Sequence, residues 1–174
     1  LTPMYSVELG AGLGNITKAL ILDENLFKVY NLFDNNIDML AMACRNMGFQ
    51  TTKVYEGESG KNYHYNLEPA SNCIIKSDVE KKTGLSCHIT DVAEMNFTVE
   101  DDFVSRCAIA HSHGLLEHFT NEQIANVLNA CRYFKQFHYV PSNKYKTPSI
   151  GDERLLSPQE WRAITGMKVE EFND

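Results

Sequence analysis

The residues best suited to chemistry near the start of the chain are an acid and three glycines. Glu8 precedes Gly10, Gly12 and Gly14, with Leu9 between the acid and the first glycine. Glycine tolerates positive φ and has no Cβ, so a turn of alternating glycines can press its backbone against a ligand. A helix that begins after this turn would direct free N–H groups and its positive dipole end toward a polar or anionic group. The stretch therefore predicts a strand, a ligand-binding turn and a helix.

The spacing of the glycines distinguishes between two cofactor classes. A dinucleotide fingerprint needs glycine at the first, third and sixth positions, and the sixth position counted from Gly10 is Asn15. The pattern is instead Glu-x-Gly-x-Gly-x-Gly, which resembles motif I of the class I S-adenosylmethionine-dependent methyltransferases. The resemblance implies that Glu8 helps to hold the amino end of the cofactor's methionine moiety, which lies over Leu9 and the glycines. The alternative is a glycine-rich turn that binds nothing.

Two further acids, Asp34 and Asp91, each end a β-prone run. Ligands of open α/β sheets bind beyond the carboxyl ends of the strands, so both acids are expected at the binding edge. The resemblance implies that Asp34, with Asn35 beside it, binds the ribose hydroxyls. It also implies that Asp91 accepts a hydrogen bond from the adenine amino group while the Val92 N–H meets the ring. The alternative for Asp34 is a solvated strand end.

A polar run from His111 to His118 follows an apolar strand that is predicted to begin at Cys107. We expect the run to form a turn and then a helix that continues to Cys131. It resembles the fourth-strand segment of small-molecule methyltransferases. The resemblance implies that the strand-end residues, His111 and Ser112, border the methyl end of the cofactor, with the turn after them.

The histidines of this run have two chemical interpretations. Imidazole titrates near neutral pH, so His113 is the first candidate for a general base that accepts a proton from the methyl acceptor, and His118 is the second. A metal site with Glu117 is the alternative, but the spacing is not His-Glu-x-x-His and the two histidines would lie on different helix faces. We therefore expect no metal. The Asn/Asp-Pro-Pro-Tyr/Phe turn of nucleobase-methylating enzymes is absent from the run, which favours a small-molecule acceptor.

The alternation of strand and helix patterns predicts the fold. Helical spacing of apolar residues over 15–22 and 37–47 alternates with strand-like runs over 27–34 and 85–91, which is typical of a parallel sheet with crossover helices. We expect an α/β Rossmann-like three-layer sandwich with a mostly parallel sheet and helices on both faces, without the family's usual last strand and N-terminal cap. We also expect residues 1–174 to form a single methyltransferase-like domain.

The middle and the end of the chain carry weaker patterns. Residues 50–86 are expected to be irregular or inserted, with the charged residues 76–82 on a solvated helix face. A fifth strand is expected to end at Pro141, and Ser157 to cap a helix. Alternation over 167–172 predicts a sixth strand.

Arg154 lies between the strand expected to end at Pro141 and the strand expected over 167–172. We expect it to pair with Asp152 or Glu153, the alternative being contact with an acceptor carboxylate or phosphate.

Composition and charge narrow the function classes. The formal net charge of −7 gives no overall positive field for binding nucleic acid. Five cysteines without Cys-x-x-Cys spacing indicate reduced thiols, and no apolar run is long enough to span a bilayer. We expect a cytoplasmic protein with no nucleic-acid or membrane partner, and a homo-oligomer or a partner that completes the sheet and the lid.

The resemblance of these motifs to the family implies a methyltransferase that transfers a methyl group from S-adenosylmethionine to a small-molecule acceptor, with S-adenosylhomocysteine as the product. One alternative is a cofactor-binding but catalytically inactive subunit, and a further one is a protein methyltransferase. A nicotinamide-dependent reductase is disfavoured by Asn15.

Overall fold

The computed structural model describes residues 5–23, 27, 29–47, 55–56, 74–78, 83–94, 107–141 and 152–172 of the chain. The helices and strands along these residues are, in chain order, β1 (Tyr5–Leu9), α1 (Asn15–Asp23), β2 (Val29–Asp34), α2 (Ile37–Asn46), β3 (Tyr55–Glu56), β4 (Ile74–Asp78), β5 (Thr83–Ile89), β6 (Cys107–His113), the 3₁₀ helix η1 (Leu116–His118), α4 (Asn121–Ala130), β7 (Lys135–Tyr139) and α5 (Pro158–Thr165).

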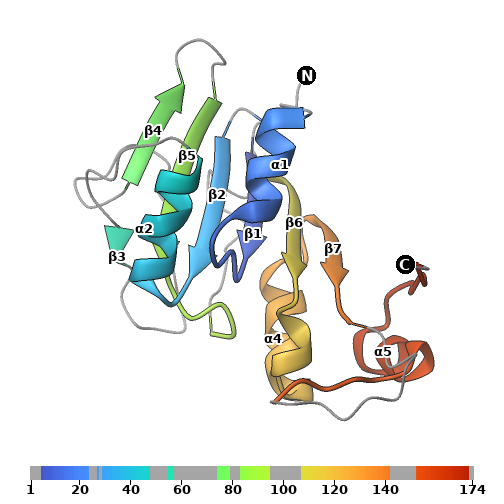
Figure 1. Ribbon diagram of the computed structural model, residues 1–174. Helices are drawn as coiled ribbons and strands as arrows, with labels where there is room; N and C mark the ends of the chain where they lie inside the picture. The colour runs from blue at the N-terminus through green and yellow to red at the C-terminus, as the bar shows by residue number, and fades with distance from the viewer. Residues whose placement is uncertain are drawn as a thin grey trace.

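The centre of the molecule is a sheet in which β5, β2, β1, β6 and β7 run parallel in that order (Figure 1). In chain order these five strands are 3-2-1-4-5, so the first strand lies in the middle and the order reverses there. The predicted α/β, Rossmann-like, mostly parallel sheet is confirmed. The carboxyl ends of all five strands consequently meet at one edge of the sheet, where ligands of such folds bind.

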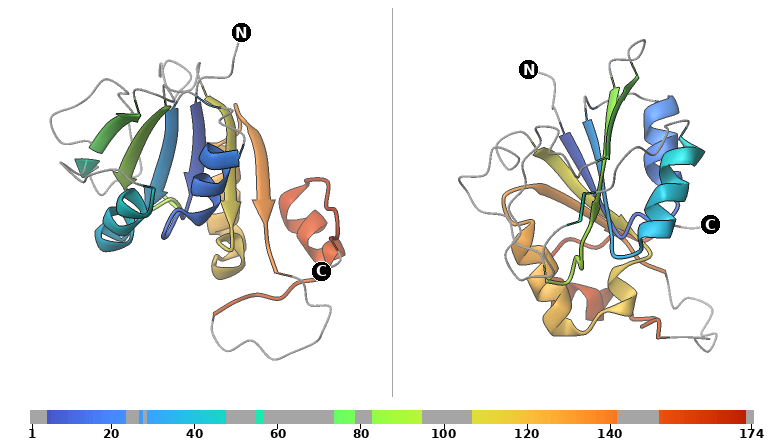
Figure 2. Two further views of the ribbon diagram at one scale, coloured as in Figure 1. Left: turned by 45° about the horizontal axis from the view of Figure 1, so that its top comes forward. Right: turned by 90° about the vertical axis from the view of Figure 1, so that its left-hand side faces the viewer.

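Helices cover both faces of the sheet, as expected. Figure 2 shows α1 and α2 on one face and α4 on the other. Leu32 and Leu85 pack with α2 on the first face, whereas Val7, Leu9 and α4 form a second cluster. Since successive strand residues point to opposite faces, Glu8 lies on the side of α1 while its neighbours enter the other cluster.

The described parts of residues 50–86 lie in the strands β3, β4 and β5. The outer edge of β5 pairs with β4 antiparallel along its first part and with β3 in parallel at its end. Lys76 and Asp78 therefore lie in an edge strand, and the expected solvated helix face is wrong for them. Edge strands of sheets commonly carry charged side chains, which is why this charged run does not distinguish the two structures.

The end of the chain agrees with the sequence in its helix but not in its last strand. Ser157 and Glu160 form a reciprocal capping box at α5, and Gly166 ends the helix with φ of +66°. Residues 167–172 form no strand, so that prediction is wrong. The alternation there has a local cause, because Val169 packs against the core cluster while Lys168 and Glu170 are exposed and pair with each other at 2.8 Å.

No helix in the described ranges combines the length and the apolar character that a membrane crossing needs.

Gly14→Ala should destabilise the fold because Gly14 combines a left-handed backbone with a crowded environment. Its φ is +70°, and an added Cβ would lie 2.8 Å from Met47 Cε and 3.1 Å from the Ala43 Cβ. Backbone strain of about 1–2 kcal/mol and overpacking of about 1–3 kcal/mol predict a total loss of about 2–5 kcal/mol in the free energy of unfolding. Urea denaturation measures this loss.

The matched control is Gly166→Ala, at φ +66° with no heavy atom within 4 Å of the added Cβ. It carries the strain alone, about 1 kcal/mol. Equal losses in the two variants would contradict the crowding around Gly14.

Candidate functional site

The glycine turn after β1 is tied to the end of β2 by Asp34. Gly10, Gly12 and Gly14 have φ of +63°, +55° and +70°. The Gly12 N–H donates to Asp34 Oδ2 at 2.9 Å, and the Asn36 N–H donates to Asp34 Oδ1 at 2.9 Å. Because an ionised carboxylate can accept about four hydrogen bonds, both oxygens keep capacity for a ligand. The turn and Asp34 thus form one preorganised unit.

Glu8 lies at the base of this turn and is 3% exposed. Thr17 Oγ1, on α1, donates a hydrogen bond to Glu8 Oε1 at 2.6 Å. Burial raises the pKa of Glu8 to about 7, against the opposing effect of the Thr17 hydrogen bonds, and the charge of Asp34 adds to the rise. No cationic side chain of the described residues contributes to this shift. A cationic ligand group beside Glu8 would supply the missing counter-charge.

The raised pKa of Glu8 predicts a pH dependence of stability. The folded pKa of about 7 exceeds the ordinary value of 4.5, so the folded state binds the extra proton and its stability falls as pH rises from 4.5 through 7. Glu8→Gln removes this titration and keeps an oxygen for the Thr17 hydroxyl. Relative to wild type, the variant should gain about 1–3 kcal/mol between pH 5 and pH 8. Urea denaturation at both pH values tests this, and a pH-independent difference would contradict it.

Asp91 lies beyond the end of β5 and is exposed. Its Oδ1 accepts the Ala93 N–H at 3.0 Å, which holds the carboxylate at the start of a turn. Thr90 donates its N–H to the Asp34 carbonyl oxygen at 3.0 Å and so links this turn to the end of β2. The structure therefore brings Asp34 and Asp91 to neighbouring strand ends.

Three other residues predicted to bind the cofactor lie at the same edge of the sheet, but their side chains differ in exposure to solvent. Asn35 is exposed directly after β2, whereas Leu9 and Val92 are buried in the core cluster that includes α4. Only the backbone of Leu9 and Val92 is thus available to a ligand, as the expected role of the Val92 N–H requires. Their binding roles stay predictions.

His111 lies at the end of a strand, as expected, and the strand also includes His113, which was expected nearest the turn. β6 continues to His113, and the helix expected to reach Cys131 is divided into η1 and α4. His111 Nδ1 and His113 Nε2 are 3.0 Å apart. Burial lowers the pKa of His111 to about 4 and lowers that of His113 as well, so both imidazoles are neutral at pH 7. A neutral imidazole can act as a base.

His111 also faces the motif region. It pairs in register with Glu8 of β1 and is 4% exposed. Among the described residues, no hydrogen-bond partner meets its buried Nε2. Buried ring nitrogens are normally paired, so Nε2 is an exception to the usual pairing in this part of the sheet.

Ser112 points to the opposite face and begins a chain of hydrogen bonds. Gln136 Nε2 donates to the carbonyl oxygens of Leu128 and Cys131, so Gln136 Oε1 must accept from His138 Nε2 at 2.9 Å. His138 Nδ1 is then an acceptor, and the Ser112 hydroxyl, 2.8 Å away, donates to it. Ser112 is 0% exposed, so this chain holds its side chain inside the protein, and its role beside the cofactor stays a prediction.

His118, the second candidate base, is held by a surface acid. Its Nδ1 lies 2.7 Å from Asp152 Oδ1, and this hydrogen bond raises the pKa of His118. Its Nε2 lies 3.7 Å from Glu117 Oε1. A cationic imidazole paired with a carboxylate is a poor proton acceptor, so the geometry favours His113 over His118 as the base.

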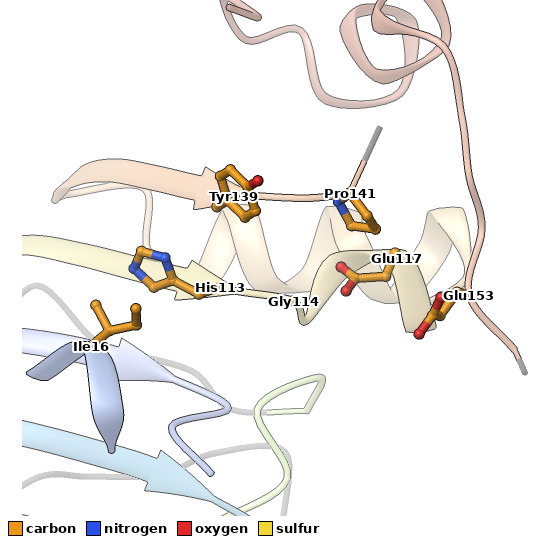
Figure 3. Close-up of a pocket in the computed structure, with 7 residues that line it drawn as sticks. All are labelled: Ile16, His113, Gly114, Glu117, Tyr139, Pro141 and Glu153. Carbon is orange, nitrogen blue, oxygen red and sulfur yellow. The ribbon is translucent and has the colours of Figure 1, made fainter. Parts of the chain in front are cut away.

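A cavity of about 550 Å³ opens beside His113 (Figure 3). Its described lining consists of Ile16, His113, Gly114, Glu117, Tyr139, Pro141 and Glu153. Of these, only His113 is expected from the sequence as a group that acts on the acceptor. Tyr139 was detectable in principle, since it pairs in register with His113, but that register depends on the neighbouring strands β6 and β7.

Arg154 does not have the expected ion-pair partners. Its Nη1 donates to the Phe119 carbonyl oxygen and its Nη2 to Asn121 Oδ1, both at 2.6 Å. The guanidinium thereby ties the segment before α5 to the start of α4. It is not among the described residues that line the cavity.

The fold is similar to two solved methyltransferase structures. The first, from Bacillus halodurans and assigned only provisionally as a methyltransferase, matches 98% of this chain with a TM-score of 0.58 and 15% identity. The second, the methyltransferase domain of bacterial CtHen1, matches 91% of this chain with a TM-score of 0.56 and 13% identity. The matches cover 65% and 71% of those two chains, respectively. No family profile matches the sequence, and no curated protein is significantly similar to it. The likeness establishes the class I methyltransferase fold.

Proposed function

We propose that this protein is an S-adenosylmethionine-dependent methyltransferase that acts on a small-molecule acceptor. The observation that carries the proposal is the unit of glycine turn and Asp34 at the carboxyl edge, joined by the Gly12 N–H to Asp34 Oδ2 bond of 2.9 Å. A glycine turn held against a strand-end carboxylate, on a methyltransferase fold, is suited to a ligand with both ribose hydroxyls and a charged amino acid end.

The donor and acceptor groups at this edge fit the two ends of that cofactor. Asp34 would accept from the ribose hydroxyls, and Asp91 from the adenine amino group. Glu8 would face the cationic amino end, because its buried carboxylate lacks a counter-charge from the described residues. When bound, the cofactor supplies an electrophilic methyl group.

His113 would accept the acceptor's proton. It lines the cavity, it is half-buried, and its lowered pKa keeps it neutral at pH 7. In the tautomer in which His113 Nε2–H donates to His111 Nδ1, 3.0 Å away, His113 Nδ1 is unprotonated and would take that proton. The cavity walls hold the acceptor in one orientation, and positioning of the two reactants supplies much of the rate enhancement in such transfers.

The proposal is tested by isothermal titration of the purified chain with S-adenosylmethionine, S-adenosylhomocysteine and NADH. We expect micromolar dissociation constants for the first two and no binding of NADH. Binding of NADH alone would replace the proposal with a nicotinamide enzyme. Cofactor binding without turnover on any acceptor would favour the inactive subunit, and turnover only on polypeptides would favour a protein methyltransferase.

A further inference from the structure

Glu117 is a buried carboxylate that lacks a full set of partners. It is 3% exposed, and its Oε2 atom has no hydrogen-bond partner among the residues that the structure describes. Native proteins pair nearly all their buried polar groups, since an unpaired one costs about 1–3 kcal/mol or more when charged. A buried oxygen of this kind indicates a missing ligand group.

The carboxyl group of Glu117 is directed into the cavity beside His113. Figure 3 shows it turned toward Gly114 and His113 from η1. A Cβ added to Gly114 would lie 3.3 Å from Glu117 Oε1, so the glycine leaves room for the carboxyl group at the cavity wall. His118 Nε2 is 3.7 Å from Oε1, whereas Oε2 is buried and has no hydrogen-bond partner among the described residues.

The other described walls of this cavity favour a cation over an anion. Glu153 adds a second carboxylate, and no lysine or arginine is among the described lining residues. Two candidate cations of the neighbouring segments are held by other groups: His118 by Asp152 at 2.7 Å, and Arg154 by the Phe119 carbonyl oxygen and Asn121. An anionic acceptor would meet two like charges there, while a cationic one would meet a complementary field.

The same walls favour an organic cation over a metal ion. Tyr139, Ile16 and Pro141 give the cavity aromatic and apolar surface, on which the body of an organic molecule can pack. No group of three or more His, Cys, Asp or Glu side chains in the described part of the chain is placed to hold a metal ion.

We propose that the methyl acceptor carries a protonated amine, which binds Glu117 Oε2 while the rest of the molecule packs against Tyr139. This inference rests on the proposed function, because only a methyltransferase would methylate the bound amine. The charge preference of the cavity itself stands without it. Glu153 contributes less than Glu117, because it is exposed and its charge is screened by water.

The test is binding of three probes that differ in charge but share a shape: benzylamine, benzyl alcohol and benzoate. Each is titrated into the chain with S-adenosylhomocysteine present and absent, and ligand-observed NMR gives the affinity. We expect benzylamine to bind at least about tenfold more tightly than benzyl alcohol, as a charge-assisted hydrogen bond allows. Benzoate should bind most weakly. Equal binding of amine and alcohol by the wild-type chain would overturn the proposal without any variant.

Two variants assign the preference to one side chain. Glu117→Gln keeps the size of the side chain and should reduce the preference for the amine to less than about threefold. Glu122→Gln removes the same charge from the exposed first turn of α4, which does not line the cavity, and should leave the preference unchanged. Thermal melts confirm that both variants fold. An unchanged preference in folded Glu117→Gln would overturn the role of Glu117.

The same titrations separate this inference from the proposed function. If S-adenosylhomocysteine binds but the amine is not preferred, the methyltransferase proposal stands and the amine proposal fails. If the amine is preferred but neither S-adenosyl compound binds, the cavity is a cation site and the methyltransferase proposal fails.

Discussion

Asp34→Ala is expected to weaken the binding of S-adenosylhomocysteine by about 10²–10⁴-fold. The carboxylate is expected to accept two ribose hydroxyl hydrogen bonds, and hydrogen bonds to a charged group contribute about 1.5–3 kcal/mol each. It also accepts the Gly12 N–H at 2.9 Å, so the glycine turn loses its fixed position in the variant. Isothermal titration at constant salt measures the change.

The matched control is Asp38→Ala. Asp38 is an exposed acid in the first turn of α2, so the variant removes the same charge from the same region. Its affinity should change by less than about threefold, since a first-turn acid affects only the helix by a few tenths of a kcal/mol. If both variants bound equally tightly, Asp34 would not be a ligand of the cofactor.

His113→Ala is expected to lower the rate of methyl transfer by about 10²–10⁴-fold, the usual contribution of a positioned general base. Binding of S-adenosylhomocysteine should change little, because the variant leaves Glu8 and Asp34 in place. Formation of S-adenosylhomocysteine with an accepted amine is the measured quantity. His118→Ala is the control. Its loss of rate should be at least about tenfold smaller than that of the His113 variant.

The pH profile distinguishes a base from a packing residue. Burial lowers the pKa of His113, so the base stays neutral below the ordinary value of 6.5 and the rate should fall only at more acidic pH. Residual activity of His113→Ala should lose this acidic limb. An unchanged limb in the variant would assign the titration to another group and remove His113 from the proton transfer.

The parallel sheet was predictable from the sequence because its signals are local. The glycine turn after β1 and Asp34 at the end of β2 are each fixed by residues close together in the chain. Alternation of strand and helix patterns then restricts the topology to a few parallel arrangements. The capping box of Ser157 and Glu160 is local in the same way, and it is present in the structure.

Features that depend on pairing between distant segments were not predictable. The alternation over 167–172 reflects burial of Val169 on the core and not pairing with a strand. His113 was expected nearest the turn, although β6 pairs with β7 through His113 and Tyr139. Lys76 lies in an edge strand, where its charge is as acceptable as on a helix.

The candidate site likewise has a part that the sequence predicts and a part that it does not. The motif residues around Gly12 and Asp34 were found in the sequence because strand ends of a parallel sheet share one edge. The cavity was not, because Glu117 and Glu153 come from separate segments that meet only in the folded chain. Burial of Glu117 Oε2 is likewise a property of the packed structure.

The most direct test of the account is an NMR titration of the isotopically labelled chain with S-adenosylhomocysteine. The account predicts saturable shifts at the amides of Gly12, Asp34 and Val92, with smaller changes at Ser112 on the neighbouring strand. Their common midpoint gives a micromolar dissociation constant. Absence of shifts at millimolar ligand, or shifts confined to α5 and other surfaces away from the strand ends, would contradict a cofactor site at the glycine turn.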